Sequence, residues 1–289
     1  MQDWYLDAVC QWEVILVRKN QLIIASFPYS QKRKLGFNYI TMPLFVKWMG
    51  LYVTREYRNA KNEQKIMSLI LPLLSEFDAF KQNFHPNFLN WSPLYWQGYL
   101  QTTYYTYQLD LTQSLVQIWA NCNRNIKRNI NKASSKLSIE TNPSPDAFYE
   151  INQMSFDRQG VRIPYSLLLF LNHDKALQQH EKRLIICAKD EKGSIHAASY
   201  LIWDQMNCYY HLSGEDPSFR KSGAGILLVW EAIKYAKIEL NLKRFDFEGS
   251  MMPKVAHIRQ QFGAAAIPYH YLWKYNNTVY KFMDALRSN

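Results

Sequence analysis

The 289-residue sequence lacks the features that mark several classes of protein. Its four cysteines, Cys10, Cys122, Cys187 and Cys208, include no C-x-x-C pair, which argues against a zinc site and a disulfide framework. It has no run of about 18 apolar residues that would span a membrane, and no basic region followed by an apolar run at its N-terminus. We therefore expect a cytoplasmic protein with reduced cysteines and no metal.

Acidic residues are outnumbered by basic ones. The chain has 24 Asp and Glu against 34 Lys and Arg, which gives a formal net charge of +10 and an isoelectric point near 9.3. This excess favours anionic partners such as phosphorylated cofactors, nucleic acids or acidic membrane surfaces. With 48% hydrophobic residues, a chain of this length can bury a full core and has room for two domains.

The order of the expected elements is clearest in the second half. Two helices, over 146–158 and 165–180, precede three strands joined by short turns, which predicts an antiparallel meander. The strands of this meander are expected over 183–190, 194–204 and 207–214. A helix after Gly223, a strand over 244–249, a helix over 255–263 and a strand over 266–275 complete the order.

The first half is expected to contain a hairpin over 12–30 and a helix over 62–77. The segment "TNPSPDAFYE" has two prolines and a serine before a helix, which predicts a domain boundary near Asn142. We therefore expect one domain over 1–142 and a second over 143–289. The final helix, "NTVYKFMDALRS", is expected to pack back on the first domain.

The stretch "RKSGAG" carries the pattern R-x-x-G-x-G between a strand and a helix. Glycine permits a positive φ and a close approach by an oxyanion, and the helix adds its positive N-terminal dipole, so the turn is a candidate pyrophosphate site. A simple helix start remains the alternative. The candidate cofactor-binding residues are Arg220, Lys221, Ser222, Gly223, Ala224 and Gly225.

The turn and the elements around it resemble the GNAT acyltransferase fold. The segments "LDLTQSLVQIWANCNRNIKRNINKA", "FPYSQKRKLGFNYITMP", "RFDFEGS" and "RQQFGAAAIPYH" are similar to landmarks of the FemAB/FemX family of peptidoglycan-branching aminoacyltransferases. The resemblance implies an α/β (α+β) chain of two tandem GNAT-like domains, each with a mixed, largely antiparallel sheet flanked by helices. It also implies acyl-coenzyme A at the glycine turn or, as in the aminoacyltransferases, an aminoacyl-tRNA donor. The family's "K-x-x-F-G" lysine corresponds to Arg259 here.

Acyl transfer to an amine needs a base and an acid, and a few residues are candidates. Asp246 and Glu248 alternate with two phenylalanines and would share a strand face, with Glu248 the first choice as base, although such a pair is often solvated or salt-bridged. Glu215 is the rival base, unless it only shapes the turn before Pro217. His211 would relay a proton or pack in the core. Tyr269 would protonate a thiolate leaving group or pack in the core.

Two further basic features point to anionic ligands. Arg259 would clamp a phosphate, polarise a carbonyl or form a surface ion pair. No acidic residue lies between Thr112 and Ser138, where basic residues recur along one helical face. This stripe would contact tRNA or remain a solvated face. The residues proposed for tRNA are Arg124, Lys127, Arg128 and Lys132.

These features leave three functions open. The first is an N-acyltransferase that moves an acyl group from acetyl-coenzyme A or another acyl-coenzyme A to an amine, by direct attack in a ternary complex. The second uses an aminoacyl-tRNA donor and a cell-wall precursor as acceptor. The third is a non-catalytic GNAT-like module that binds RNA or an anionic surface. The sequence leaves the oligomeric state open.

Overall fold

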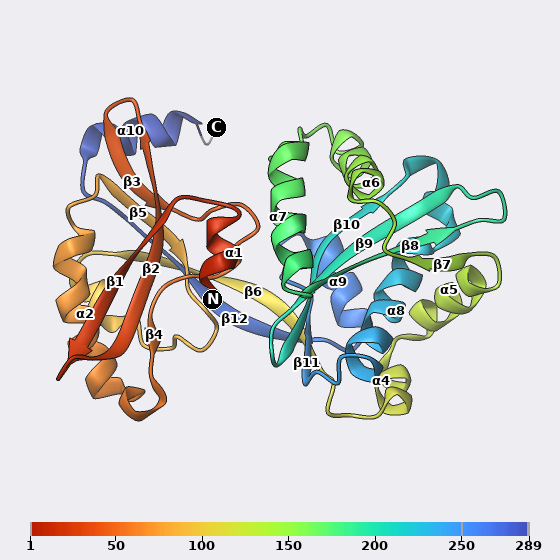
Figure 1. The fold of residues 1–289 in the computed structure, drawn as a ribbon, viewed down its shortest axis with the longest axis horizontal. Coiled ribbons are helices and arrows are strands. Elements are labelled where there is room, and N and C mark those ends of the chain that lie inside the picture. The colour runs from red at the N-terminus through yellow and green to blue at the C-terminus, as the bar shows by residue number, and fades with distance from the viewer. Residues whose placement is uncertain (1, 250, 288–289) are drawn as a thin grey trace. The chain divides into compact units, whose positions relative to one another are not determined.

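The computed structural model describes residues 2–249 and 251–287, and the chain forms two compact units (Figure 1). Unit 1 comprises Met1–Tyr104 and Pro268–Asn289, and unit 2 comprises Tyr105–Ile267. Two strands, β6 (Leu100–Asp110) and β12 (Ala265–Tyr275), carry the chain between the units. None of the helices in the described part of the chain is long and apolar enough to cross a membrane.

Unit 1 is built on the strand order β1-β2-β3-β5-β12, and the short strand β4 pairs with β2. The expected hairpin is present, since β1 pairs antiparallel with β2. The helix expected over 62–77 is α2, whose N-cap Asn59 accepts a hydrogen bond from the Asn62 N–H, as a capping residue should. The elements are α1 (Asp3–Asp7), β1 (Trp12–Lys19), β2 (Leu22–Lys34), β3 (Phe37–Thr41), β4 (Tyr52–Val53), η1 (Arg55–Tyr57), α2 (Ala60–Leu74), β5 (Ala79–Asn83), α3 (Ser92–Trp96) and α10 (Thr278–Arg287).

The core of unit 1 is apolar and aromatic. Phe27, Phe80 and Phe84 are fully buried and their rings contact one another. Helix α10 packs on this unit, because the ring of Tyr280 lies against β3 and Asp284 pairs with Lys81 on β5. The last residue of the helix expected from the sequence, Ser288, lies outside the described residues.

Unit 2 is built on the strand order β6-β11-β10-β9-β8-β7. The predicted meander is present: β8, β9 and β10 pair antiparallel in sequence. The elements are α4 (Leu115–Asn121), α5 (Arg124–Ser134), β7 (Ser138–Thr141), α6 (Pro145–Asp157), α7 (Leu167–Gln179), β8 (Arg183–Lys189), β9 (Ile195–Trp203), β10 (Asn207–Glu215), η2 (Pro217–Ser222), α8 (Ala224–Ile238), β11 (Arg244–Asp246) and α9 (Pro253–Gln261).

Helices cover both faces of the unit 2 sheet (Figure 1). Ala197 and Leu201 of β9 belong to the core cluster that α8 and α5 complete. Tyr200, between them, turns to the other face and contacts Phe148 of α6 and Phe170 of α7. This alternation is the period of two that a strand imposes, and it places the two helix layers on opposite sides.

Two details differ from the sequence-based expectations. The boundary near Asn142 falls inside unit 2, because α4 and α5 precede it and contribute Ile118, Ile126 and Ile130 to the unit 2 core. The basic, helix-periodic segment is two helices rather than one, since Cys122 takes an extended conformation between them and Asn123 caps the second. The "TNPSP" segment instead serves to start α6, with Ser144 as its N-cap.

Candidate active site in unit 2

The strands β10 and β11 separate after a short paired stretch. They pair in parallel only where Asn207–Tyr209 meets Arg244–Asp246, while β10 continues to Glu215. The chain leaves β11 at Glu248 and Gly249, which both have positive φ, 55° and 74°. A Cβ on Gly249 would lie 2.5 Å from the Tyr105 carbonyl oxygen, so this position requires glycine. The strand expected over 244–249 therefore ends early, and a gap opens beside β10.

A β-bulge directs His211 to one side of this gap. The register with β9 shifts between Tyr210 and Leu212, so His211 is the extra residue of the bulge. Its Nδ1 lies 2.9 Å from Glu248 Oε2, and its Nε2 lies 3.2 Å from Nε2 of His173 on α7. The three side chains thus form one buried chain, in which Glu248 has the most exposed side chain, at 14%. The sequence placed His211 and Glu248 among the candidates but did not predict this contact.

Asp246 is buried and satisfied by hydrogen bonds. It accepts from the Thr106 hydroxyl at 2.5 Å, from Gln108 Nε2 at 2.7 Å and from the Glu248 N–H at 2.7 Å. Burial raises the pKa of Asp246 to about 6, although these hydrogen bonds act in the opposite direction. Asp246 therefore holds the backbone of Glu248 in place through the Glu248 N–H. The solvated position considered from the sequence is wrong for Asp246, because its side chain is buried.

Arg259 of α9 lies against residues of β10 and of the segment that follows β11. Its guanidinium stands over the rings of Phe247, 4.7 Å from the centroid, and Tyr210, at 5.1 Å. Its buried Nε has no hydrogen-bond partner, and Arg259 makes no ion pair within residues 2–249 and 251–287. Burial lowers the pKa of Arg259, but an arginine keeps its proton at neutral pH. The surface ion pair considered from the sequence is therefore not formed.

The glycine turn has the expected backbone conformation. Gly223 has φ 81° and is the N-cap of α8. The Ala224 N–H is bonded to the Ser222 hydroxyl, and a Cβ on Gly223 would lie 3.4 Å from both Ala133 and the Asn129 carbonyl of α5. Helix α5 thus covers one side of the turn.

With the Glu215 side chain in its present position, the turn does not fit a pyrophosphate. The carboxylate of Glu215 lies where a Cβ of Gly225 would project, in the first turn of α8. A carboxylate at a helix N-terminus takes the favourable position for an anion and repels a second one. The second glycine of the motif therefore accommodates Glu215. Glu215 is not among the residues that the His211 contacts bring together.

Exposed cations lie on the turn and on the helix beside it. Asn129 and Ala133 of α5 lie against Gly223, so the helix that carries several basic residues packs beside the turn that carries Arg220 and Lys221. The basic surface consists of Arg124, Arg128, Lys132, Arg220 and Lys221, all exposed. None of them makes an ion pair within the described part of the chain. Lys127 differs, because its Nζ donates to the Ala120 carbonyl at 2.8 Å.

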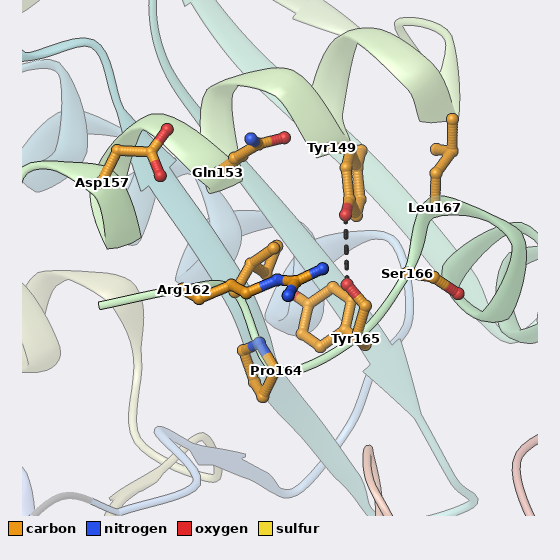
Figure 2. Close-up of a pocket in the computed structure, with 9 residues that line it drawn as sticks. Tyr149, Gln153, Asp157, Arg162, Pro164, Tyr165, Ser166 and Leu167 are labelled. Carbon is orange, nitrogen blue, oxygen red and sulfur yellow. Dashed lines mark hydrogen bonds between the residues drawn. The ribbon is translucent and has the colours of Figure 1, made fainter. Parts of the chain in front are cut away.

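A pocket of about 600 Å³ lies between α6 and the segment that leads to α7 (Figure 2). Tyr149 donates to the Tyr165 carbonyl at 3.1 Å, and the Arg162 side chain extends beside Tyr165 (Figure 2). The Tyr165 hydroxyl donates to Asn152 Oδ1 at 2.5 Å, and Asn152 Nδ2 donates to the Ser213 carbonyl at 2.7 Å. Asn152 therefore links the wall of the pocket to the part of β10 that borders the gap. No sequence pattern predicted this pocket.

Tyr269 is not part of this cluster. It belongs to unit 1, is buried, and contacts the rings of Trp48 and Tyr104. The residues that the sequence analysis missed are polar side chains on otherwise apolar surfaces, above all His173 in "LLLFLNHDKAL" and Asn152. The available signal in the sequence was a polar residue at a position where the helical period places a buried side chain. The described residues include no group of three His, Cys, Asp or Glu placed to hold a metal ion.

Comparisons with known proteins agree with this geometry. Residues 120–253, all in unit 2, match the family model of the acetyltransferase (GNAT) domain. No curated protein sequence matches the chain.

Solved structures extend the likeness to both units. FemX superposes with a TM-score of 0.70 at 11% identity, over 97% of this chain and 92% of that one. A tandem GNAT protein from the clavulanic acid biosynthesis pathway gives a TM-score of 0.58 at 11% identity, over 91% and 82%. The C-terminal domain of a putative lysylphosphatidylglycerol synthetase from Agrobacterium fabrum gives 0.61 at 12% identity, over 98% and 90%.

Residues 120–253 of unit 2 therefore match the acetyltransferase (GNAT) domain model, and the whole chain has the fold of FemX and of the tandem GNAT structure. The predicted fold class is confirmed, and so is the resemblance to FemX, as a likeness of fold.

Proposed function

We propose that the chain transfers an acyl group from an anionic carrier to an amine, by direct attack of the amine in a ternary complex. The observation that carries this proposal is the separation of β10 from β11, with the Glu248–His211 pair beside it and Arg259 over Tyr210 and Phe247. The buried Nε of Arg259 has no hydrogen-bond partner among the described residues. Arg259 lies over the rings of Tyr210 and Phe247, the residues that directly precede His211 and Glu248 in the sequence.

Each of these residues has a role in the proposed reaction. Glu248 accepts a proton from the acceptor ammonium, and the amine nitrogen then forms a bond to the acyl carbon. Arg259 stabilises the negative charge that develops on the acyl oxygen, in a site where burial strengthens the interaction. The bond between the acyl carbon and the carrier then breaks, and the leaving carrier takes up the proton that the attacking nitrogen loses as the amide forms. This scheme requires no covalent intermediate on the protein.

The basic surface favours an aminoacyl-tRNA as the donor. The cations of α5 extend over an 11-residue helix, about 16 Å long, which matches a nucleic-acid backbone better than a single pyrophosphate. Glu215 adds to this preference, because its carboxylate opposes a phosphate at the first turn of α8.

Acyl-coenzyme A is the second candidate donor. Gly223 has the left-handed conformation that lets N–H groups face an anion, and the GNAT family model covers this turn. Binding there would require the Glu215 side chain to move. Removing its charge in Glu215→Gln should therefore increase the affinity for coenzyme A if this carrier is used.

The pocket between α6 and α7 is a candidate place for the acceptor. Arg162 supplies a positive charge there and Asp157 a negative one, and Tyr149 and Gln153 supply polar groups. An acceptor that carries an anionic group beside its amine, such as an amino acid, an amino sugar phosphate or a cell-wall precursor, has the matching chemistry.

The test compares the two donors on one panel of acceptors. Transfer is followed from radiolabelled aminoacyl-tRNA, and thiol release is followed from acetyl-coenzyme A, with amino acids, amino sugars and cell-wall precursors as acceptors. Transfer from the charged tRNA, with none from acetyl-coenzyme A, is the expected result. Thiol release that depends on the acceptor would instead identify coenzyme A as the carrier. RNA binding without turnover from either donor would favour the non-catalytic module and overturn the proposal.

A further inference from the structure

The buried chain of His173, His211 and Glu248 extends the candidate site into α7. Rings of His173 and His211 lie 5.2 Å apart between centroids, and their Nε2 atoms are 3.2 Å apart. His173 is fully buried, and the His211 side chain is 2% exposed. Histidine is uncommon at such positions, and a buried one usually has a hydrogen-bonding role.

Helix α7 is held rigidly at this point. Asp174, next to His173, accepts a hydrogen bond from the Tyr200 hydroxyl at 2.7 Å and pairs with Arg183 at 3.1 Å. Both of these partners lie on strands of the same sheet, β8 and β9. The contacts of Asp174 with the sheet therefore fix the position of the adjacent His173.

The contacts of His211 determine the protons on the two imidazoles. When Glu248 is ionised it only accepts, so His211 Nδ1 must carry the hydrogen of that contact. A neutral imidazole then has a lone pair on Nε2, and the hydrogen between the two rings must come from His173 Nε2. The opposite assignment would leave His211 Nδ1 without a hydrogen and place two lone pairs face to face.

We infer that His173 is a positioning residue for the proposed base: its Nε2–H holds His211 in the tautomer that donates to Glu248. This inference deepens the proposed function and rests on it for the role of Glu248. In this arrangement His211 fixes the orientation of a carboxylate whose backbone has a strained, positive φ. The same logic applies wherever a third group orients a histidine that supports a reacting group. Burial and the neighbouring His211 lower the pKa of His173, which agrees with a neutral ring.

The inference is tested without substrate, by nitrogen-15 NMR of the histidine rings in the full chain. The parent protein should show His211 protonated at Nδ1 and unprotonated at Nε2, with His173 protonated at Nε2. In His173→Phe, which keeps an aromatic ring but removes the donor, Glu248 still favours a hydrogen on Nδ1, but the fraction of His211 protonated at Nε2 should rise measurably above that of the parent. His173→Gln retains an N–H near the Nε2 position and should restore the parental His211 signals.

A matched control separates this role from simple packing. Leu177→Ala creates a cavity under the same helix, because Leu177 is buried on α7. It should lower the unfolding midpoint while the His211 tautomer stays as in the parent. A parent His211 protonated at Nε2, or an unchanged His211 tautomer in His173→Phe, would overturn the inference.

Activity provides a separate readout. With a working donor, His173→Phe should lower kcat about 10-fold with little change in KM, and His173→Gln should recover most of it. If the predicted tautomers are observed but Glu248→Gln remains fully active, the positioning is correct and the assignment of Glu248 as base is wrong. The failure of each proposal is thus recognisable on its own.

Discussion

The two units bury different kinds of side chain. In unit 1 the buried polar residues within the described chain are Ser30 and Gln82, and neither is ionisable. Unit 2 buries His173, Asp174, His196, His211 and Asp246. Burying an ionisable group costs free energy unless it is hydrogen-bonded or paired. The stability of unit 2 therefore depends on the hydrogen bonds of these five groups, a demand that an apolar core of the same size does not make. Two of the five contact Glu248.

The largest effect should come from the proposed base. Glu248→Gln keeps the shape and a hydrogen bond but removes basicity, so kcat should fall about 100- to 10,000-fold with little change in donor affinity. Steady-state rates with the active donor measure this effect. The control is Glu231→Gln, on α8, where the carboxylate only pairs with Lys234. Equal rates for the two variants would move the role away from Glu248.

The buried carboxylate of unit 2 should make stability depend on pH. The folded pKa of Asp246, about 6, lies above its ordinary value of 3.8, so the folded state holds this proton more tightly than the unfolded state. Its contribution is fully present below about pH 4 and is lost as the pH rises through 6, with a total of about 3 kcal/mol. Asp246→Asn should flatten this part of the curve. Urea unfolding at several pH values checks it, and parallel curves for parent and variant would contradict it.

The basic surface should distinguish unit 2 from unit 1 in salt dependence. Reversing Arg128 and Lys132 to Glu should weaken tRNA binding about 10-fold at low salt and reduce the slope of log affinity against log salt by roughly two. Lys61 and Lys65 on α2 have the same spacing in unit 1 and are also exposed. Their reversal should leave the slope near that of the parent. The same loss in both variants would mean that only net charge matters.

A smaller effect is expected at the glycine turn. Gly225→Ala places a Cβ against the Glu215 carboxylate, and the resulting overpacking should lower the free energy of unfolding by about 1 kcal/mol, despite alanine's better helix propensity. Thermal unfolding measures the change. Shortening the neighbour in Gly225→Ala/Glu215→Ala should restore stability. If it does not, Glu215 is not the reason for the glycine.

The smallest effect is expected for the buried amide of unit 1. Gln82 donates to the Pro28 carbonyl at 3.2 Å, but its buried Oε1 has no hydrogen-bond partner among the residues that the structure describes. Gln82→Leu removes that unsatisfied atom together with one hydrogen bond, so the free energy of unfolding should change by less than about 1 kcal/mol. Urea unfolding tests this. A loss of several kcal/mol would show that unit 1 also depends on the hydrogen bonds of its buried polar side chains.

The sequence predicted the elements of unit 2 well, because their apolar periodicity is strong and their turns are short. It predicted the fold class through the order of those elements around the glycine turn. The early end of β11 was missed, since it depends on a close approach between Gly249 and the Tyr105 carbonyl, which are far apart in sequence. The break at Cys122 was missed as well, because the helical spacing continues through it.

The candidate site was predicted only in part. Glu248 and His211 were named from residue type and strand position, and Arg259 from its short helix and its correspondence to the family's "K-x-x-F-G" lysine. The structure shows where each lies. The contact between His211 and His173 depends on a bulge and on the packing of α7, which no local pattern reveals. The contact of Glu215 with Gly225 likewise joins residues on the two sides of η2. It changes the interpretation of a sequence motif that is typical of a phosphate site.

The division of the chain also determines the order in which the units can be completed during synthesis. Unit 1 needs β12, whose residues Tyr271–Tyr275 pair with β5 and whose Leu272 is fully buried in its core. These residues emerge from the ribosome only after all of unit 2. Until then β5 has an unpaired edge and the unit 1 core lacks one of its members, while unit 2 already has its whole sheet except for contributions from β12. Nascent unit 1 therefore waits for the last strand, and it is the part of the chain most exposed to chaperones and misassembly before release.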